Sequence, residues 1–315
     1  MSSPDTPQVS VVICTRNRAA SLRETLNSVL TAAKAAPDVT LEVVVVDNGS
    51  TDGTAERVRE WAANADLDVR IAPEPRVGLA NARNTGVEAA RGDIIVFTDD
   101  DCRPQEDFFT ALIKNYAEHD GPVIIGGRVE LGDPQDLPMT IKTDKDPATF
   151  DGVDPGAFLI GSNLTMNRAA WRKVGLMDER LGAGTPLKAS EETDYIHRAW
   201  LAGIPIHYRP DLCVFHFHGR RSLDDMKKLW AGYSIGNGAL FAKYWGTPYT
   251  RLLRWNVKNA VKELLGGPKV DATLGLTYRT MVLGNAEGML RYWTQTPKQQ
   301  PAAPATSASP TTSEA

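Results

Sequence analysis

Short apolar runs alternate with longer polar or amphipathic stretches through the first third of the chain. Three of these runs are continuous and rich in β-branched residues: Val9–Cys14, Leu41–Val46 and Ile94–Phe97. Such runs are typical of strands covered on both faces. We expect helices over residues 21–33, 54–63, 79–90 and 105–118, with one further short strand over 69–71. This alternation predicts an α/β fold, a mainly parallel, Rossmann-like sheet flanked by helices.

The second half of the chain has a more mixed pattern. We expect strands over residues 123–131, 157–166 and 213–218, and a helix from an N-cap at Ser190 to about Ala202. Beyond Ser222 the periodicity is helical. The pattern predicts an N-terminal tail (1–7), an α/β domain (8–221), a C-terminal helical region (222–296) and a disordered Pro/Ala/Ser/Thr-rich tail (297–315).

The composition is that of an ordinary globular protein, with 42% hydrophobic and 23% charged residues among 315. The three cysteines lie far apart, which disfavours a disulfide framework and favours a reducing compartment. No leader-like segment opens the chain, and no apolar run reaches the roughly 18 residues of a membrane-spanning helix. We therefore expect a cytoplasmic protein.

Charge is divided unevenly along the chain. Residues 1–220 hold 23 Lys and Arg against 33 Asp and Glu, a net charge of −10, whereas residues 221–296 hold 11 against 5, a net charge of +6. An acidic front and a basic back indicate two functional surfaces.

Polar residues follow the expected strands at the edge where ligands bind to open parallel sheets. Thr15 and Arg16 follow the first strand, Asp47 ends the second, and Asp99–Asp101 end the strand that begins at Ile94. Asp47 opens an Asp-Asn-Gly-Ser sequence that is equally typical of a plain turn. Three adjacent carboxylates repel one another, so the acidic triplet favours a bound Mg²⁺ or Mn²⁺.

Other candidates lie outside these strand ends. Arg83 has the donors to neutralise a phosphate, or it is a solvated helix arginine. Glu191 and Glu192 open a helix, where the dipole favours carboxylates, and either has the chemistry of a general base. His216 and His218 share one face of a strand, which suits a metal or phosphate contact as well as a core position.

Two nucleotide-binding motifs are absent from the sequence. The loop after the first strand, Thr15–Ala20, has no glycine, which argues against a GxGxxG oxidoreductase, and no GxxxxGK[ST] sequence occurs. Two classes of protein without these motifs remain open as alternatives. One is a sugar nucleotidyltransferase, for which Arg16 and Arg18 are hints of a basic loop. The other is a catalytically inactive sugar-nucleotide-binding or scaffold protein.

Five stretches, in order and at plausible spacing, resemble glycosyltransferase family 2, whose members are inverting and have the GT-A fold. They are VSVVICTRNRAASLRETLNSVL, EVVVVDNGSTDGT, GLANARNTGVEAARGDIIVFTDDD, GSNLTMNRAAWRKVGLMDE and SEETDYIHRAWLAG. The resemblance covers about residues 8–220. It implies transfer of a sugar from a UDP-, GDP- or TDP-linked donor to a hydroxyl of a carbohydrate or lipid-linked acceptor. Cell-surface polysaccharide or glycolipid synthesis is the expected setting, and no nucleic acid is expected as a partner.

The resemblance also implies roles for residues. Those expected to bind the nucleotide sugar are Thr15, Arg16, Asp47, Arg83, Asp99 and Asp100. Asp101 is the expected direct metal ligand of a DxD motif, with Asp99 and His216 completing the Mn²⁺ or Mg²⁺ site. The family's base is usually the Asp of a Glu-Asp pair. Glu192 aligns with that Asp, but its side chain is one methylene longer, so Glu191 and Glu192 both remain candidates.

The basic C-terminal region contains an amphipathic helix over residues 251–265. Arg251, Arg254, Lys258 and Lys262 form one stripe, and Leu253, Val257, Ala260, Val261 and Leu264 form another. Four of the seven tryptophans, Trp230, Trp245, Trp255 and Trp293, lie in the same region. The pattern fits an interfacial helix on an anionic membrane surface, at the inner face of the membrane. It fits equally a helix docked on the catalytic domain with a solvated basic face.

Overall fold

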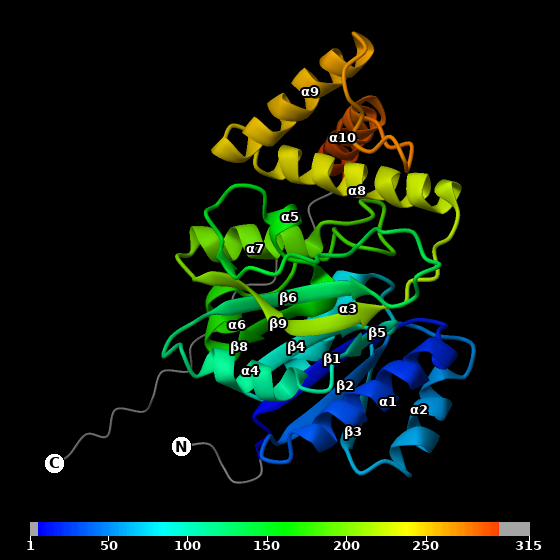
Figure 1. Cartoon of the computed structure of the whole chain (residues 1–315), viewed down its shortest axis with the longest axis vertical. Coiled ribbons are helices and arrows are strands. Elements are labelled where there is room, and N and C mark those ends of the chain that lie inside the picture. Colours follow the sequence, from blue (N-terminus) through cyan, green and yellow to red (C-terminus); the bar gives the residue numbers. More distant parts are fainter. Residues whose placement is uncertain (1–5, 296–315) are drawn as a thin grey trace, which may run out of the picture.

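The computed structural model describes residues 6–295, which form one nine-stranded mixed sheet covered by helices (Figure 1). The strand order is β3-β2-β1-β4-β8-β6-β9-β5, with β7 paired to β9. Strands β1–β4 are parallel; β8 is antiparallel to β4 and β6, while β6 and β9 are parallel. The strands are β1 Val9–Thr15, β2 Leu41–Asp47, β3 Asp68–Pro73, β4 Ile94–Asp99, β5 Cys102–Pro104, β6 Ile124–Leu131, β7 Ala148–Thr149, β8 Leu164–Asn167 and β9 Ile206–His216.

Helices cover both faces of this sheet, as the continuous apolar strands predict. One core lies between the sheet and α1, α2 and α4, and the other lies between the sheet and α3, α6 and α7. Successive side chains of β1 point to opposite faces of the sheet, so Val11 and Ile13 lie in the first core and Val12 lies in the second. The helices are α1 Ala19–Ala35, α2 Thr54–Ala62, α3 Leu79–Ala89, α4 Phe108–Tyr116, α5 Pro155–Phe158, α6 Arg168–Val174 and α7 Glu191–Leu201.

One expected strand is wrong. Residues 157–166 do not form a single strand but the end of α5, a 3₁₀ turn at Gly161–Asn163 and the start of β8. The reason is local, because the Asp154 carboxylate accepts a hydrogen bond from the Ala157 N–H and Pro155 fits the first helical turn. The strand expected at residue 213 begins earlier, at Ile206.

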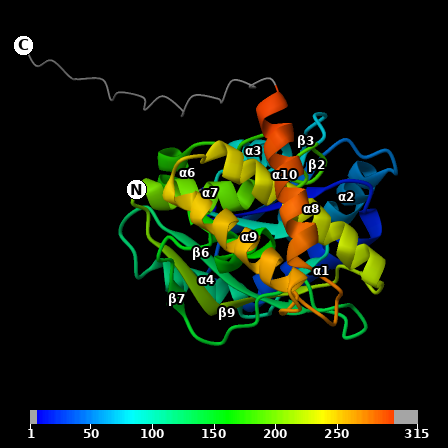
Figure 2. The ribbon, with the colours of Figure 1, turned by 90° about the horizontal axis from the view of Figure 1, so that it is seen from above.

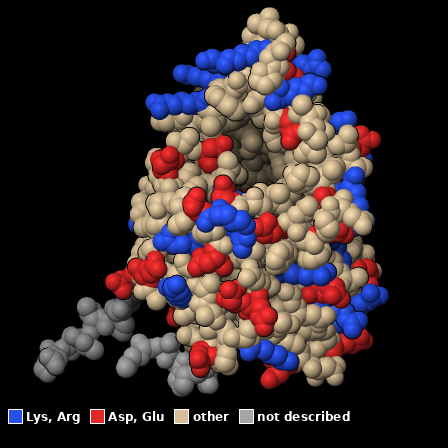
Figure 3. Space-filling view, in the orientation of Figure 1, with Lys and Arg blue, Asp and Glu red and all other residues tan. Residues whose placement is uncertain are grey.

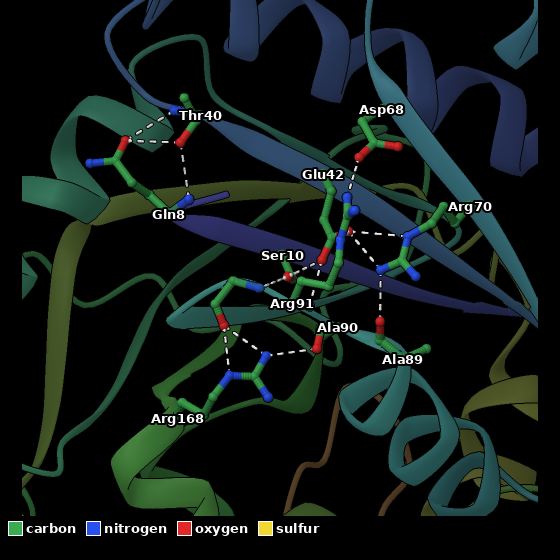
Figure 4. Close-up of polar contacts among 11 residues, drawn as sticks. Gln8, Ser10, Thr40, Glu42, Asp68, Arg70, Ala89, Ala90, Arg91 and Arg168 are labelled. Carbon is green, nitrogen blue, oxygen red and sulfur yellow. Dashed lines mark hydrogen bonds and ion pairs between the residues drawn. The ribbon is translucent and has the colours of Figure 1, made fainter. Parts of the chain in front are cut away.

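The amino ends of the parallel strands carry a buried carboxylate, Glu42 (Figure 4). It accepts hydrogen bonds from Ser10 Oγ at 2.6 Å, from the Arg91 backbone N–H at 2.6 Å and from the Arg70 guanidinium at 2.6 Å. Burial alone would raise the pKa of Glu42, but these donors hold it below its ordinary value. Gly92 packs tightly against this cluster. A side chain would not fit there, because a Cβ would come within 2.7 Å of the Ser10 nitrogen.

Three further helices form a separate layer above the sheet: α8 Leu223–Lys243, α9 Arg251–Leu264 and α10 Tyr278–Thr294 (Figures 1 and 2). Glycines let α8 and α10 approach closely, since a Cβ at Gly288 would overlap the Ile235 carbonyl and one at Gly238 would overlap Asn285. Among residues 6–295 no helix has both the length and the apolar character needed to cross a bilayer.

Buried ion pairs connect this layer to the sheet domain. Lys243 Nζ, at the end of α8, lies 2.8 Å from Asp178 and 2.7 Å from Asp194 of α7. Tyr244 donates a hydrogen bond to Asp194 at 2.7 Å, and Arg180 pairs with Asp178 at 2.7 Å. These contacts hold the end of α8 against α7, the helix that begins with the two candidate bases, Glu191 and Glu192.

Candidate active site

The carboxyl ends of β1, β2 and β4 meet at one edge of the sheet. In the strand register Thr15 pairs with Asp47, and Cys14 pairs with Asp99. The register therefore places side by side three residues expected from the sequence, although the strands are separated by some thirty to fifty residues of chain.

The acidic turn after β4 is tied to the loop after β1. Asp100 accepts a hydrogen bond from Thr15 Oγ1 at 2.7 Å, and Arg18 lies 3.1 Å from Asp100 and 2.8 Å from Asp101. From the sequence, Arg18 was considered only as part of a basic loop in a nucleotidyltransferase, and its pairing with the acidic triplet was not expected. Its cation offsets part of the repulsion within the triplet.

His216 reaches the triplet because β9 pairs with the short strand β5. Cys102 stands opposite His216 in this pairing, and the Phe217 N–H donates to the Asp101 carbonyl at 2.9 Å. As a result His216 Nε2 lies 3.3 Å from Asp101 Oδ1. The ring's Nδ1 lies 3.2 Å from the Thr140 carbonyl oxygen.

The donor atoms in this corner fit a hard divalent cation. One ligand atom each of Asp99, Asp101, Cys102 and His216 lies within 4.8 Å of the others. Carboxylates with an imidazole suit Mn²⁺ or Mg²⁺. Burial raises the pKa of the Cys102 thiol well above its ordinary value, which disfavours the thiolate form that binds metals.

Arg83 of α3 connects this corner to the start of α7. Its guanidinium lies 2.9 Å from Glu191 and 3.5 Å from Asp99, and the side chain is only 4% exposed. A Cβ at Gly161 would come within 2.7 Å of the guanidinium, so the absence of a side chain there leaves room for it. The burial rules out a solvated helix arginine.

The two glutamates at the start of α7 have different surroundings. Glu191 is buried against Arg83, whereas Glu192 is half-buried and forms no ion pair with a cation among residues 6–295. Burial and the charge of Glu192 raise the pKa of Glu191 to about 8, while Arg83 opposes the shift. Burial and the charges of Glu192 and Asp99 raise the pKa of Tyr233 of α8. No pattern in the sequence had singled out Tyr233.

Carboxyl groups outnumber cationic side chains in this corner. The carboxylates are Asp99, Asp100, Asp101, Glu191 and Glu192, and the cations facing them are Arg18, Arg83 and, when protonated, His216. Burial raises the pKa of Asp99, and it raises that of Asp100 to about 7 against the pull of Arg18. Burial would also raise the pKa of Asp101, but His216 and Arg18 outweigh burial and hold the Asp101 pKa at about 2.

A cavity of about 210 Å³ adjoins the ends of β1 and β2, and Thr15 and Arg16 line it. Asn48 shapes its wall, because the side chain donates to the Glu74 carbonyl and accepts from the Gly78 N–H, both at 2.9 Å. Sequence reasoning had missed Asn48. Asp47, next to it, accepts a hydrogen bond from the Ser50 N–H at 2.9 Å and so forms the turn that its sequence suggests.

His218 lies beside His216 but outside the four-residue cluster. The two ring centroids are 5.1 Å apart, and His218 Nδ1 accepts a hydrogen bond from the Arg220 N–H at 3.0 Å. Within residues 6–295, neither His218 Nε2 nor Arg220 Nη1 has a hydrogen-bond partner, although both atoms are buried.

The fold is the GT-A fold of glycosyltransferases. A mannosyltransferase of Pyrobaculum calidifontis, solved with GDP-Man and Mn²⁺, superposes with a TM-score of 0.59 at 20% identity over 94% of this chain and 77% of that chain. S. aureus TarS 1–349, solved with UDP-GlcNAc, superposes with a TM-score of 0.53 at 15% identity over 90% of this chain and 89% of that chain.

The family model described as glycosyl transferase family 2 matches residues 10–172, and the chain belongs to this family. Glycosyltransferase AglE of Haloferax volcanii is 37% identical over 126 residues, 40% of each chain. The pre-mycofactocin glycosyltransferase of Mycobacterium tuberculosis is 26% identical over 224 residues, 69% of this chain and 44% of the relative. The chain thus spans less than half the length of these relatives.

Proposed function

We propose that this protein is an inverting glycosyltransferase that moves a sugar from a nucleoside diphosphate to an acceptor hydroxyl with the help of Mn²⁺ or Mg²⁺. The observation that carries the proposal is the convergence of Asp99, Asp101 and His216 beside Arg83 and an accessible Glu192. Solved neighbours with the same fold bind GDP-Man with Mn²⁺, UDP-GlcNAc or UDP, which supports a nucleotide-sugar donor here. The acceptor would be a carbohydrate or a lipid-linked sugar in cell-surface polysaccharide or glycolipid synthesis.

The donor would lie across the carboxyl ends of β1, β2 and β4. Its base would enter the cavity lined by Thr15 and Arg16, with Asp47 at the end of the neighbouring strand. Asp100 is hydrogen-bonded to Thr15, so we assign it to the ribose side of the site. The more exposed Asp99 faces Arg83, so we assign it to the diphosphate side.

Asp101, Asp99 and His216 would hold the cation, which supplies positive charge to the leaving diphosphate. Arg83 adds a fixed guanidinium whose position is set by Glu191 rather than by the ligand. A pre-oriented charge in a buried site stabilises charge that develops during reaction without further reorganisation.

Glu192 would accept the proton of the acceptor hydroxyl, which attacks the anomeric carbon from the face opposite the leaving group. Glu192 is half-buried and pairs with no cation in the described part of the chain, whereas Glu191 is buried and engaged with Arg83. Direct displacement of this kind inverts the configuration of the sugar. Glu191 is then a positioning residue for Arg83.

The engagement of Arg18 weighs against a nucleotidyltransferase. That activity would favour a free basic loop after β1 to receive a triphosphate, and Arg18 is already paired with Asp100 and Asp101. Arg16 is the one cation of this loop that has no ion-pair partner among residues 6–295.

A turnover assay on the full chain tests the proposal. It would measure release of UDP, GDP or TDP from a panel of sugar nucleotides with Mn²⁺, Mg²⁺ or EDTA. We expect metal-dependent release with one donor, and a loss of about a hundredfold to ten-thousandfold in kcat for Glu192→Gln, since a general base contributes roughly that factor. Glu192→Gln should bind the nucleoside diphosphate as wild type does. Unchanged turnover in Glu192→Gln would refute the base assignment, and no turnover with any donor would refute the proposed activity.

A further inference from the structure

Helix α9 has a docked face and an outer face. Asn256 and Ala260 are buried where α9 packs on α10, and Asn256 donates a hydrogen bond to the Asn285 side chain at 3.2 Å. Val257, Val261 and Leu264 point away from this contact and are 43%, 52% and 68% exposed. The apolar stripe expected from the sequence is therefore split, and much of it faces outward.

Cations line the same outer face. The exposed basic residues are Arg251, Arg254, Lys258 and Lys262. Within residues 221–295 the ion pairs involve Arg221, Lys227, Lys243 and Arg291, so the four cations of α9 have no ion-pair partner in the described part of the chain. Figure 3 shows Lys and Arg gathered on the layer that contains α9, above a hollow in this side of the molecule.

Aromatic side chains border this face. Trp255 is 54% exposed and meets Tyr278 edge-on, with ring centroids 5.6 Å apart. At the other end of the layer Trp245 and Trp293 make a similar edge-on contact at 6.0 Å, and both are more than half exposed. Exposed tryptophans beside aliphatic and basic residues are typical of segments at the boundary between lipid and water.

We propose that the outer face of α9 docks in the headgroup region of an anionic lipid bilayer. This face comprises Arg251, Arg254, Trp255, Val257, Lys258, Val261, Lys262, Leu264 and Leu265. The aliphatic ridge enters the boundary between headgroups and acyl chains, and the flanking cations contact lipid phosphates. A second copy of this chain is the poorer occupant, because two such faces would bring eight unpaired cations together.

The position of α9 in the molecule suits this contact. It belongs to the layer that lies above the sheet, and in the view from above neither the sheet nor its flanking helices cover it (Figures 1 and 2). The buried pairs of Lys243 with Asp178 and Asp194 fix this layer to the domain below, so docking would orient the whole molecule on the bilayer. The inference does not depend on the proposed activity, because membrane binding is measured without turnover.

Co-sedimentation of the full chain with vesicles tests the inference. Vesicles of phosphatidylcholine alone would be compared with vesicles that also contain phosphatidylglycerol. We expect binding to the mixed vesicles only, and weaker binding at higher salt because the lipid charge is screened. Arg254→Glu with Lys258→Glu should weaken binding by at least about tenfold, since each cation near an anionic surface contributes roughly fivefold.

A second variant and a matched control separate the two contributions. Val261→Ser with Leu264→Ser removes the apolar part at exposed positions and should weaken binding about tenfold. Lys34→Glu with Arg57→Glu makes the same charge change on α1 and α2, at the opposite end of the molecule, and should leave binding unchanged. Absence of wild-type binding to the mixed vesicles, or equal weakening by the control, would overturn the inference. So would light scattering that shows a dimer lost in the α9 variants, which would assign the face to a second copy.

Discussion

The two ends of the parallel strands carry buried carboxylates in opposite electrostatic conditions. At the amino ends, Glu42 is surrounded by Ser10, Arg70 and Arg91, and its pKa is lowered (Figure 4). At the carboxyl ends, burial raises the pKa of Asp99 and Asp100 although Arg83 and Arg18 lie beside them. The first cluster is complete within the chain, and the second is short of positive charge.

This difference indicates which buried acids are structural. Carboxylates that stabilise the fold find enough donors in the protein, as Glu42, Asp178 and Asp194 do. In the triplet at the carboxyl ends, the three carboxylates repel one another and the neighbouring cations neutralise them only in part. Titratable groups with perturbed pKa values of this kind are common at functional sites. A divalent cation is the simplest group that removes this shortage.

Among the variants that compare the two carboxylate clusters, Asp101→Asn should have the largest effect, a loss of activity. Asp101 holds both His216 and Arg18, so the substitution removes a cation ligand and the contacts that orient the other groups. Loss of several kcal/mol of transition-state stabilisation corresponds to a fall of about a thousandfold in kcat/KM. Steady-state kinetics with varied Mn²⁺ measures it. A variant that keeps wild-type turnover and wild-type dependence on Mn²⁺ would remove Asp101 from the metal site.

Lys243→Met should lower stability by about 3 kcal/mol. The change leaves Asp178 and Asp194 without their shared cation, and removing one partner of a buried ion pair commonly costs about that much. Arg180 and Arg198 still pair with the two carboxylates and limit the loss. Urea unfolding measures the free energy of unfolding, and a change below about 1 kcal/mol would mean that the ion pairs of Lys243 contribute little to holding the layer on the domain.

Glu42→Gln should destabilise the protein by about 2 kcal/mol, less than Lys243→Met because the partner arginines are partly exposed to solvent. Its turnover per folded molecule should match wild type. A loss of turnover without a loss of stability would contradict the structural role of the amino-end cluster.

Asp100→Asn should have the smallest effect and the opposite sign. With EDTA present near pH 8, it should stabilise the protein by about 1 kcal/mol, because it removes a buried charge that Arg18 only partly compensates. A loss of stability under these conditions would show that the ion pair with Arg18 outweighs the cost of burial.

The pH dependence sharpens the same contrast. The folded protein keeps the Asp100 proton up to about pH 7, whereas the unfolded chain releases it near pH 4, so this group makes the free energy of unfolding fall as pH rises between those values. Glu42 acts in the opposite sense, since its contribution is present above its unfolded pKa and is lost as pH falls through its lowered folded pKa. In EDTA, Asp100→Asn should flatten the decline toward neutral pH, and Glu42→Gln should reduce the loss in acid. Urea titrations at several pH values measure both slopes.

Much of the parallel half of the sheet was predictable from the sequence, because strands covered on both faces leave continuous β-branched runs such as Val9–Cys14 and Leu41–Val46. The stretch over 157–166 was not, since Asp154 and Pro155 start a short helix where the apolar pattern suggests a strand. A helix turn of this kind depends on one cap and not on periodicity.

The residues of the candidate site fall into the same two groups. Thr15, Asp47 and Asp99 were predictable because each ends or follows a recognisable strand. Arg18 and Tyr233 were not, because their roles depend on how the loop after β1 folds back and how α8 lies over α7. No local pattern distinguishes these side chains from solvated ones.

Thermal unfolding of the full chain with UDP, GDP or TDP, each in Mn²⁺, Mg²⁺ or EDTA, tests most directly whether the acidic cluster holds a cation and a nucleotide. Ligands that bind the folded state raise its apparent stability. We predict a higher Tm with one diphosphate and a divalent cation together, lost in EDTA and in Asp101→Asn. A folded wild-type sample whose Tm moves with none of these combinations would contradict the account.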